Sequence, residues 1–205
     1  MAVIKDTYEP GDDFANEKLV YDDEDDTILY AAHGLIIAGG GDDVYIPGSD
    51  ITYKQTILGK AGDDSLSVSW KGSVLNGGRG DDTLSLSDTS FGSRAFGGAG
   101  QDTLNLYLRV EKPAGKVVMA GNTGYDELFL IDYGSTGARV DLDAGTVKRA
   151  YEGSFVTVAR ISGIEKATGT GSSTSGDRLL GSDRKEYLDG REGDDVIQGK
   201  AVKTP

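Results

Sequence analysis

The sequence predicts an all-β protein whose strands stack as the coils of a parallel β-roll or β-helix. The first observation is an internal repeat of about 20 residues, in which an acidic residue is followed two places later by a large apolar one. Self-similarity at such a period is typical of solenoids. The second is the alternation of apolar and small polar residues after each acidic residue, which indicates a strand with one buried face. The repeated acidic anchors are Asp26, Asp43, Asp64, Asp82, Asp102 and Asp126.

Each repeat also contains a weaker strand on the N-terminal side of its glycine-rich turn. An apolar residue lies seven places before most of the anchors, at Ile36, Ile57, Leu75, Ala95 and Met119. A coil therefore consists of a turn, a strand, a second turn and a second strand, and stacking lets each coil bury its apolar stripe against its neighbours. The second turn varies in length, so we expect one uniform acidic edge and one variable edge.

The repeat changes character along the chain. The segment after the regular coils has no metal-turn signature, although its alternation indicates strands. Near the C-terminus the spacing tightens to nine residues, at Asp177, Glu186 and Asp195. The predicted divisions are an N-terminal cap at 1–25, a parallel β-roll with one metal turn per coil at 26–131, an irregular coil or loop insertion at 132–168, C-terminal nonapeptide coils at 169–200 and a tail at 201–205.

The composition narrows the classes of partner. The 34 acidic and 21 basic residues give a net charge of −13, which disfavours nucleic acid and anionic membranes and attracts cations. The chain contains no cysteine, so disulfides and thiolate metal sites are excluded. No segment approaches the roughly 20 apolar residues of a membrane-spanning helix. The N-terminus lacks the apolar core of a secretory signal peptide.

The recurring turns have the chemistry of a site for a hard divalent cation. Glycine allows backbone conformations in which carbonyl oxygens point inward, and a carboxylate ends each turn. Ca²⁺ takes six to eight oxygen ligands, many of them backbone carbonyls. Stacked turns would align carboxylates about 4.8 Å apart, where they repel one another unless a cation lies between them. Ordinary glycine-aspartate turns are the alternative, but the number of copies in register favours the cation. No EF-hand pattern occurs.

The turns resemble the nonapeptide G-G-x-G-x-D-x-U-x of RTX proteins, where U is large and apolar. GGRGDDTLS at 77–85 and GGAGQDTLN at 97–105 match it throughout. GKAGDDSLS at 59–67 and GREGDDVIQ at 190–198 depart only at the second position. GNTGYDELF at 121–129 keeps the first and fourth glycines and the aspartate, and AGGGDDVYI, which follows Ile37, begins with alanine and has tyrosine as U.

This resemblance implies a right-handed parallel β-roll that binds several Ca²⁺ ions, belongs to a secreted bacterial protein exported by a type I system, and folds outside the low-calcium cytosol. It implies ligands from the sixth-position aspartate and nearby glycine carbonyls. Because the second turns of the regular coils lack the motif, we expect one row of ions there. The predicted ligands are Asp43, Asp64, Asp82, Asp102, Asp126, Asp177, Asp195, Gly39, Gly41, Gly62, Gly78, Gly80, Gly98, Gly100, Gly124 and Gly193.

No catalytic residue is predicted, and the expected function is a structural and secretory role. His33, the single histidine, is interpreted as structural, and no G-x-S-x-G nucleophile motif occurs. Asp88 lies outside the glycine turns and is expected to matter little for calcium. One alternative is a β-helix epimerase or lyase acting on an acidic polysaccharide. It rests on the second-turn basic residues Lys71, Arg94, Arg109, Lys112 and Lys116. The other is a glycan-binding or adhesion module that uses the variable edge without chemistry. The partners are therefore calcium and either an extracellular polysaccharide or a larger parent polypeptide.

Overall fold

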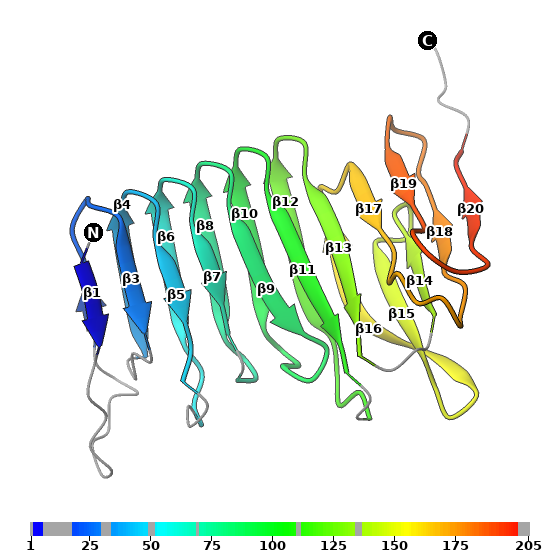
Figure 1. Ribbon diagram of the computed structural model, residues 1–205, viewed down its shortest axis with the longest axis horizontal. Coiled ribbons are helices and arrows are strands. Elements are labelled where there is room, and N and C mark those ends of the chain that lie inside the picture. Colours follow the sequence, from blue (N-terminus) through cyan, green and yellow to red (C-terminus); the bar gives the residue numbers. More distant parts are fainter. Residues whose placement is uncertain are drawn as a thin grey trace.

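The structure is a computed structural model that describes residues 2–5, 18–29, 34–48, 52–68, 70–109, 112–133 and 137–200. Every regular element in these ranges is a β-strand, and the strands stack in two sheets as a β-solenoid (Figure 1). The predicted all-β fold of stacked parallel coils is therefore confirmed. No helix long and apolar enough to cross a membrane occurs among the described residues. Residues 201–205 of the predicted tail, and much of the predicted cap, lie outside the described ranges.

Successive strands alternate between the two sheets except at β14, β15 and β16, which all belong to one sheet, and nearly all neighbours are parallel. Sheet A contains, in spatial order, β1 (Ala2–Lys5), β3 (Asp26–Leu29), β5 (Val44–Ile46), β7 (Ser65–Ser67), β9 (Thr83–Ser87), β11 (Thr103–Leu108), β13 (Glu127–Asp132), β17 (Lys166–Thr168) and β19 (Tyr187–Asp189). Sheet B contains β2 (Lys18–Val20), β4 (Leu35–Gly40), β6 (Thr56–Ala61), β8 (Val74–Arg79), β10 (Arg94–Ala99), β12 (Val117–Thr123), β16 (Ser154–Ser162), β15 (Thr146–Tyr151), β14 (Ala138–Asp141), β18 (Arg178–Leu180) and β20 (Val196–Gln198).

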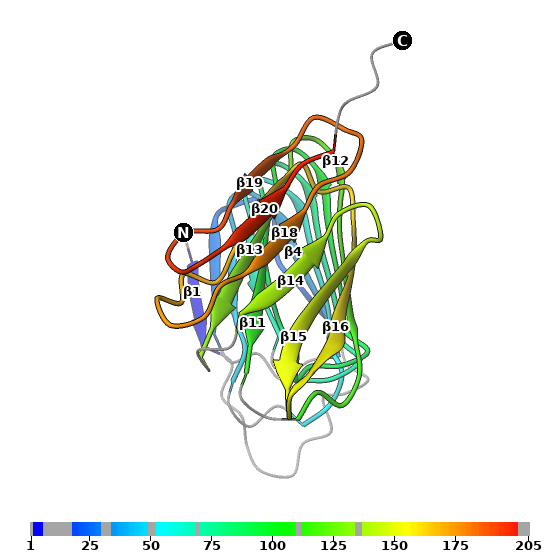
Figure 2. The same cartoon turned by 90° about the vertical axis from the view of Figure 1, so that its right-hand side faces the viewer.

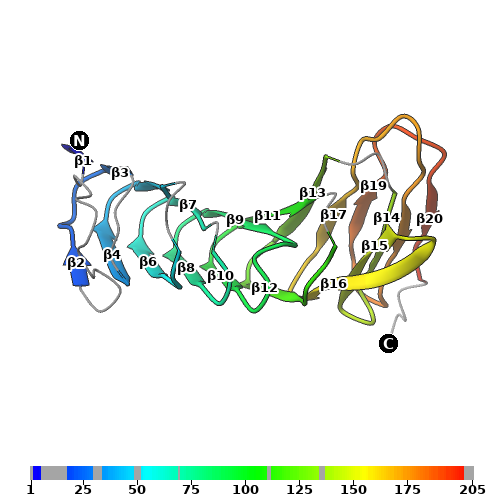
Figure 3. The same cartoon turned by 90° about the horizontal axis from the view of Figure 1, so that it is seen from below.

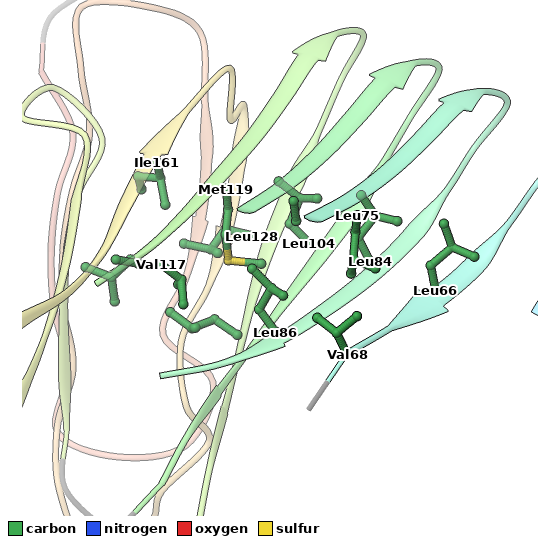
Figure 4. Close-up of a cluster of buried hydrophobic side chains, with 14 of the residues drawn as sticks. Leu66, Val68, Leu75, Leu84, Leu86, Leu104, Val117, Met119, Leu128 and Ile161 are labelled. Carbon is green, nitrogen blue, oxygen red and sulfur yellow. The ribbon is translucent and has the colours of Figure 1, made fainter. Parts of the chain in front are cut away.

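The core forms because equivalent apolar residues stack in columns between the sheets. In sheet A the register pairs Leu66 with Leu84, Leu84 with Leu104, and Leu104 with Leu128. All four side chains are almost fully buried, and Figure 4 shows them among leucine, methionine and isoleucine side chains of the facing sheet. Each fully buried leucine contributes roughly 1.5–3 kcal/mol of transfer free energy. The column therefore fixes the register that aligns the turns of successive coils.

The middle segment enlarges sheet B. After β13 the chain forms β14 and β15, which pair antiparallel, and β15 pairs antiparallel with β16. Strand β16 then pairs in parallel with β12 and completes a coil with β17. The segment predicted as an irregular coil or loop insertion thus consists largely of strands. In Figure 3 the two sheets lie farther apart at this end of the solenoid than in the regular coils.

Candidate metal-binding edge

The glycine-rich turns lie along one edge of the solenoid, at the top of Figure 1. Each of them joins a strand of sheet B to the next strand of sheet A, as between β8 and β9 or between β10 and β11. We call this the glycine edge and define it by the turns that end at the aspartates Asp26, Asp43, Asp64, Asp82, Asp102 and Asp126. All six aspartates are buried, with exposed fractions of 0–4%. The structure thus brings together five of the seven predicted aspartate ligands in one row.

One carboxylate oxygen of each buried aspartate holds the coils together. The backbone N–H of Asp64 donates to Oδ1 of Asp82 at 2.9 Å, and the N–H of Asp82 donates to Oδ1 of Asp102 at 2.9 Å. The same bond joins the aspartates from Asp26 through Asp126, and the N–H of Asp126 donates to Oε2 of Glu165 at 3.1 Å. The row of bonds therefore ends at the glutamate that precedes β17.

The second oxygen of five of these carboxylates has no hydrogen-bond partner within the described ranges. These buried Oδ2 atoms belong to Asp43, Asp64, Asp82, Asp102 and Asp126. Burial raises the pKa of Asp64 and of Asp82 to about 7, and that of Asp43 and of Asp102 to about 6. The same cause raises the pKa of Asp126. A buried carboxylate without a compensating partner is costly, so this row of oxygens needs a proton or a cation.

Glycine at the first motif position leaves room for these oxygens. A β-carbon on Gly77 would overlap Oδ2 of Asp82, and one on Gly97 would overlap Oδ2 of Asp102. A β-carbon on Gly59 would overlap Oδ2 of Asp64, and it would lie 2.6 Å from the carbonyl oxygen of Gly77 in the next coil. A carboxylate oxygen and a carbonyl oxygen from neighbouring coils thus converge beside this glycine.

The second and fourth motif positions require positive φ, which the nine predicted glycine ligands all adopt, between 89° and 151°. At Gly80, with φ 121°, a β-carbon would overlap the carbonyl oxygen of Gly62 in the preceding coil. The motif departures at the second position keep the same backbone: Lys60, Asn122 and Arg191 are three of the four described non-glycine residues with positive φ. The degenerate copies therefore retain the geometry of the turn.

A second row of carboxylates, which the sequence reasoning missed, runs beside the buried one. It consists of exposed aspartates at the fifth motif position. The N–H of Asp63 donates to Oδ1 of Asp42 at 2.8 Å, the N–H of Asp81 donates to Oδ1 of Asp63 at 2.7 Å, and the N–H of Gln101 donates to Oδ1 of Asp81 at 2.6 Å. Here the later coil donates to the earlier one, whereas in the buried row the earlier coil donates. The doubled aspartate in GDD is the sequence signal for this pair of rows.

The remaining predicted ligands lie on the opposite edge. Asp177 and Asp195 precede strands of sheet B, as does Gly193, so their turns join sheet A to sheet B. The N–H of Asp177 donates to Oδ1 of Asp195 at 2.7 Å, which repeats the buried row on this edge. Unlike the five aspartates with an unpartnered Oδ2, Asp177 has partners for both oxygens: the N–H of Ala138 donates to Oδ1 at 2.6 Å, and the backbone N–H of Thr170 donates to Oδ2 at 2.6 Å. Successive acidic residues at the nine-residue spacing therefore lie on alternate edges of the solenoid.

Side-chain ligands alone do not form a metal site among the described residues, because no three histidine, cysteine, aspartate or glutamate side chains converge. The available donors are one orphaned carboxylate oxygen per coil and carbonyl oxygens of adjacent glycine turns. This donor set fits an oxygen-binding cation such as Ca²⁺, for which backbone carbonyls are normal ligands.

The other residues singled out from the sequence have different surroundings. Asp88 is fully buried and forms an ion pair with the buried guanidinium of Arg149 from β15, away from the glycine turns, and its small expected effect on calcium binding stays a prediction. Lys71 lies 5.4 Å from the ring centre of Trp70, and Arg109 lies 4.7 Å from that of Tyr133. His33 lies outside the described residues.

Comparison with known proteins identified no relative of the chain: neither a family model nor a curated protein matches it.

Proposed function

We propose that the chain is a calcium-binding module of the RTX type, whose coils order when Ca²⁺ binds along the glycine edge. The observation that carries this proposal is the row of five buried carboxylate oxygens that have no partner among the described residues, four of them beside the first glycine of the motif. The net charge of −13 and the resemblance of the turns to the RTX nonapeptide support it. The site residues are Asp43, Asp64, Asp82, Asp102 and Asp126, with the carbonyl oxygens of the glycines in adjacent turns.

The aspartates and the glycine turns have different roles in the proposed site. Oδ1 of each buried aspartate accepts a backbone N–H of the preceding coil, which orients the carboxylate and leaves Oδ2 for the ion. Positive φ at the second and fourth motif positions turns carbonyl oxygens toward the neighbouring coil. A bound calcium ion would supply the positive charge that compensates the buried carboxylates. Binding free energy then becomes folding free energy, as in other small metal-stabilised domains.

The biological role that follows is structural. Buried like charges oppose folding where calcium is scarce, so the chain would stay expanded in the cytosol and fold after export. The resemblance to RTX repeats supports a module of a secreted bacterial protein that leaves the cell through a type I system, either as part of a larger polypeptide or alone.

Far-ultraviolet circular dichroism in chelator and in calcium tests the proposal. We expect the β-sheet spectrum to develop with added Ca²⁺ and to be lost when the ion is removed. Asp82→Ala should reduce the number of bound ions and weaken the order of the central coils. Asp81→Ala is the matched control, because the neighbouring side chain is exposed and lies in the other carboxylate row. An unchanged, fully folded β spectrum in chelator would contradict the proposal.

A glycan-binding role is the second candidate, because a groove of about 540 Å³ crosses the outer face of sheet A. It is lined by hydroxyls such as those of Ser67 and Ser87 and by Tyr107 and Arg109. The ring of Tyr107 stacks with that of Tyr133 at 6.1 Å between centroids. Glycan-array binding that Tyr107→Ala abolishes, without product formation, would support this role. Turnover of an acidic glycan would instead support the epimerase or lyase alternative.

A further inference from the structure

The inserted strands carry a concentration of positive charge that the calcium proposal does not use. Residues 138–162 hold four basic and three acidic residues, in a chain whose net charge is −13. Two outward-facing cations of this region are Arg139 on β14 and Lys148 on β15, and a third cation, Arg178, lies on the adjoining strand β18. Figure 2 shows these three strands at the end of the solenoid that faces the viewer.

The register places the three cations in one row across adjacent strands. Arg139 is directly opposite Lys148 in the antiparallel pair and directly opposite Arg178 in the parallel pair. Their chain neighbours Val140, Val147 and Leu179 are buried in the core, so all three cationic side chains lie on the outer face of sheet B. Residues opposite one another in a sheet have β-carbons about 4.5–5.5 Å apart. Three like charges therefore share one short stretch of surface.

None of the three forms an ion pair with a carboxylate within the described ranges. Asp141, which lines the same pocket, accepts a hydrogen bond from the backbone N–H of Ala144 at 2.9 Å. Like charges directly opposite one another destabilise a sheet. The arrangement is thus unfavourable by itself and becomes favourable when an anion lies among the three cations.

The site is hollow and partly preorganised. A pocket of about 170 Å³ is lined by Arg139, Lys148, Arg178 and Asp141 among others. The guanidinium of Arg139 stacks on the half-exposed ring of Phe155, with 3.5 Å between the guanidinium carbon and the ring centre. The stacking orients the planar guanidinium group and leaves its N–H groups available for hydrogen bonds. The spacing of these N–H groups matches the oxygens of phosphate and sulfate.

We propose that this pocket binds a tetrahedral oxyanion, a phosphate or sulfate group, through Arg139, Lys148 and Arg178. The site is independent of the glycine edge, because it lies on the outer face of sheet B and uses none of the motif aspartates. The ligand is either a free anion or a sulfated or phosphorylated group on a larger molecule.

Nuclear magnetic resonance of the calcium-loaded protein, titrated with sodium sulfate at constant ionic strength, tests the proposal. The Nε–H signals of Arg139 and Arg178 should shift and saturate, whereas that of Arg94, an exposed arginine of sheet B outside the pocket, should not. Arg139→Gln should weaken sulfate binding about tenfold or more, because hydrogen bonds to charged groups are among the strong ones. Arg178→Gln gives the same test without disturbing the stack on Phe155.

Control measurements distinguish a specific anion-binding site from nonspecific attraction of anions to exposed positive charges. Arg94→Gln should bind sulfate like the parent protein. Saturation with a sulfated or phosphorylated sugar at lower concentration than with sulfate would assign the group to a larger ligand, and equal affinity would assign the free anion. Unsaturable shifts, equal affinities of the Arg94→Gln and Arg139→Gln variants, or acetate binding as tightly as sulfate would overturn the proposal.

Discussion

Replacing Asp82 with asparagine should change stability in opposite directions with and without calcium. In the cation-free protein the burial of Asp82 raises its pKa to about 7, from an ordinary value of 3.8. The charged form is therefore disfavoured in the folded state. The stability that the protonated group provides is complete below the ordinary pKa and is lost as the pH rises through about 7.

The magnitude follows from that shift. A difference of about three pKa units corresponds to about 4 kcal/mol at about pH 8. The amide of Asp82→Asn can still accept the N–H of Asp64, but its NH₂ group replaces an oxygen that has no partner among the described residues. An unsatisfied buried donor costs about 1–3 kcal/mol. In chelator at about pH 8 the variant should thus be more stable than the parent protein by about 1–3 kcal/mol. In calcium it loses a ligand and should be less stable.

Urea unfolding of both proteins, in chelator and in calcium, measures the two signs. Asp81→Asn is the control, because the exposed neighbour carries no buried charge, and its effect should be small in both conditions. In chelator at about pH 5 the parent carboxyl is largely protonated, so the advantage of the variant should disappear. Destabilisation of Asp82→Asn by the same amount in chelator and in calcium would refute the reasoning.

Three further predictions concern the scaffold. Lys60→Gly should stabilise the protein by roughly 1 kcal/mol, because lysine there adopts a φ of 93°, and thermal melting should show a higher midpoint. Gly80→Ala should prevent stable folding because its β-carbon would overlap a carbonyl oxygen, whereas Gly153→Ala, which also has positive φ but open space around it, should cost only about 1 kcal/mol by the same measurement. Removing either partner of the buried Asp88–Arg149 pair should cost about 3–5 kcal/mol in urea unfolding, and replacing both with apolar residues should recover much of the loss.

The inward positions of the regular coils follow directly from the sequence. Ile57 and Leu75 on sheet B and Leu84 on sheet A are fully buried, as the seven-residue offset and the strand alternation predict. Periodicity succeeds here because each coil repeats the same local rule, and the parallel register transmits it to the next coil. The position of the acidic turns on one edge follows for the same reason.

Other features depend on contacts that no local pattern reports. The pairing of Arg149 with Asp88 joins residues 61 positions apart, and nothing around either residue marks it as buried. The antiparallel pairing of β14 and β15 also escapes a repeat-based reading, because strand alternation does not reveal the direction of the neighbour. The edge change at Asp177 could have been inferred from the nine-residue spacing, since nine residues make only half of a coil.

The two carboxylate rows explain why the turn so often contains two consecutive aspartates. Because neighbouring residues point to opposite sides, Asp81 lies at the surface while Asp82 lies beneath the turn. Both rows bridge coils through Oδ1, but the exposed row keeps its second oxygen in water, whereas the buried row does not. Five buried, unpartnered oxygens, each costing a few kcal/mol when charged, together rival the 5–15 kcal/mol by which a domain is normally stable. This comparison is why we propose that the stack folds fully at neutral pH only when a cation compensates that row, so that ion binding at the glycine edge would control folding.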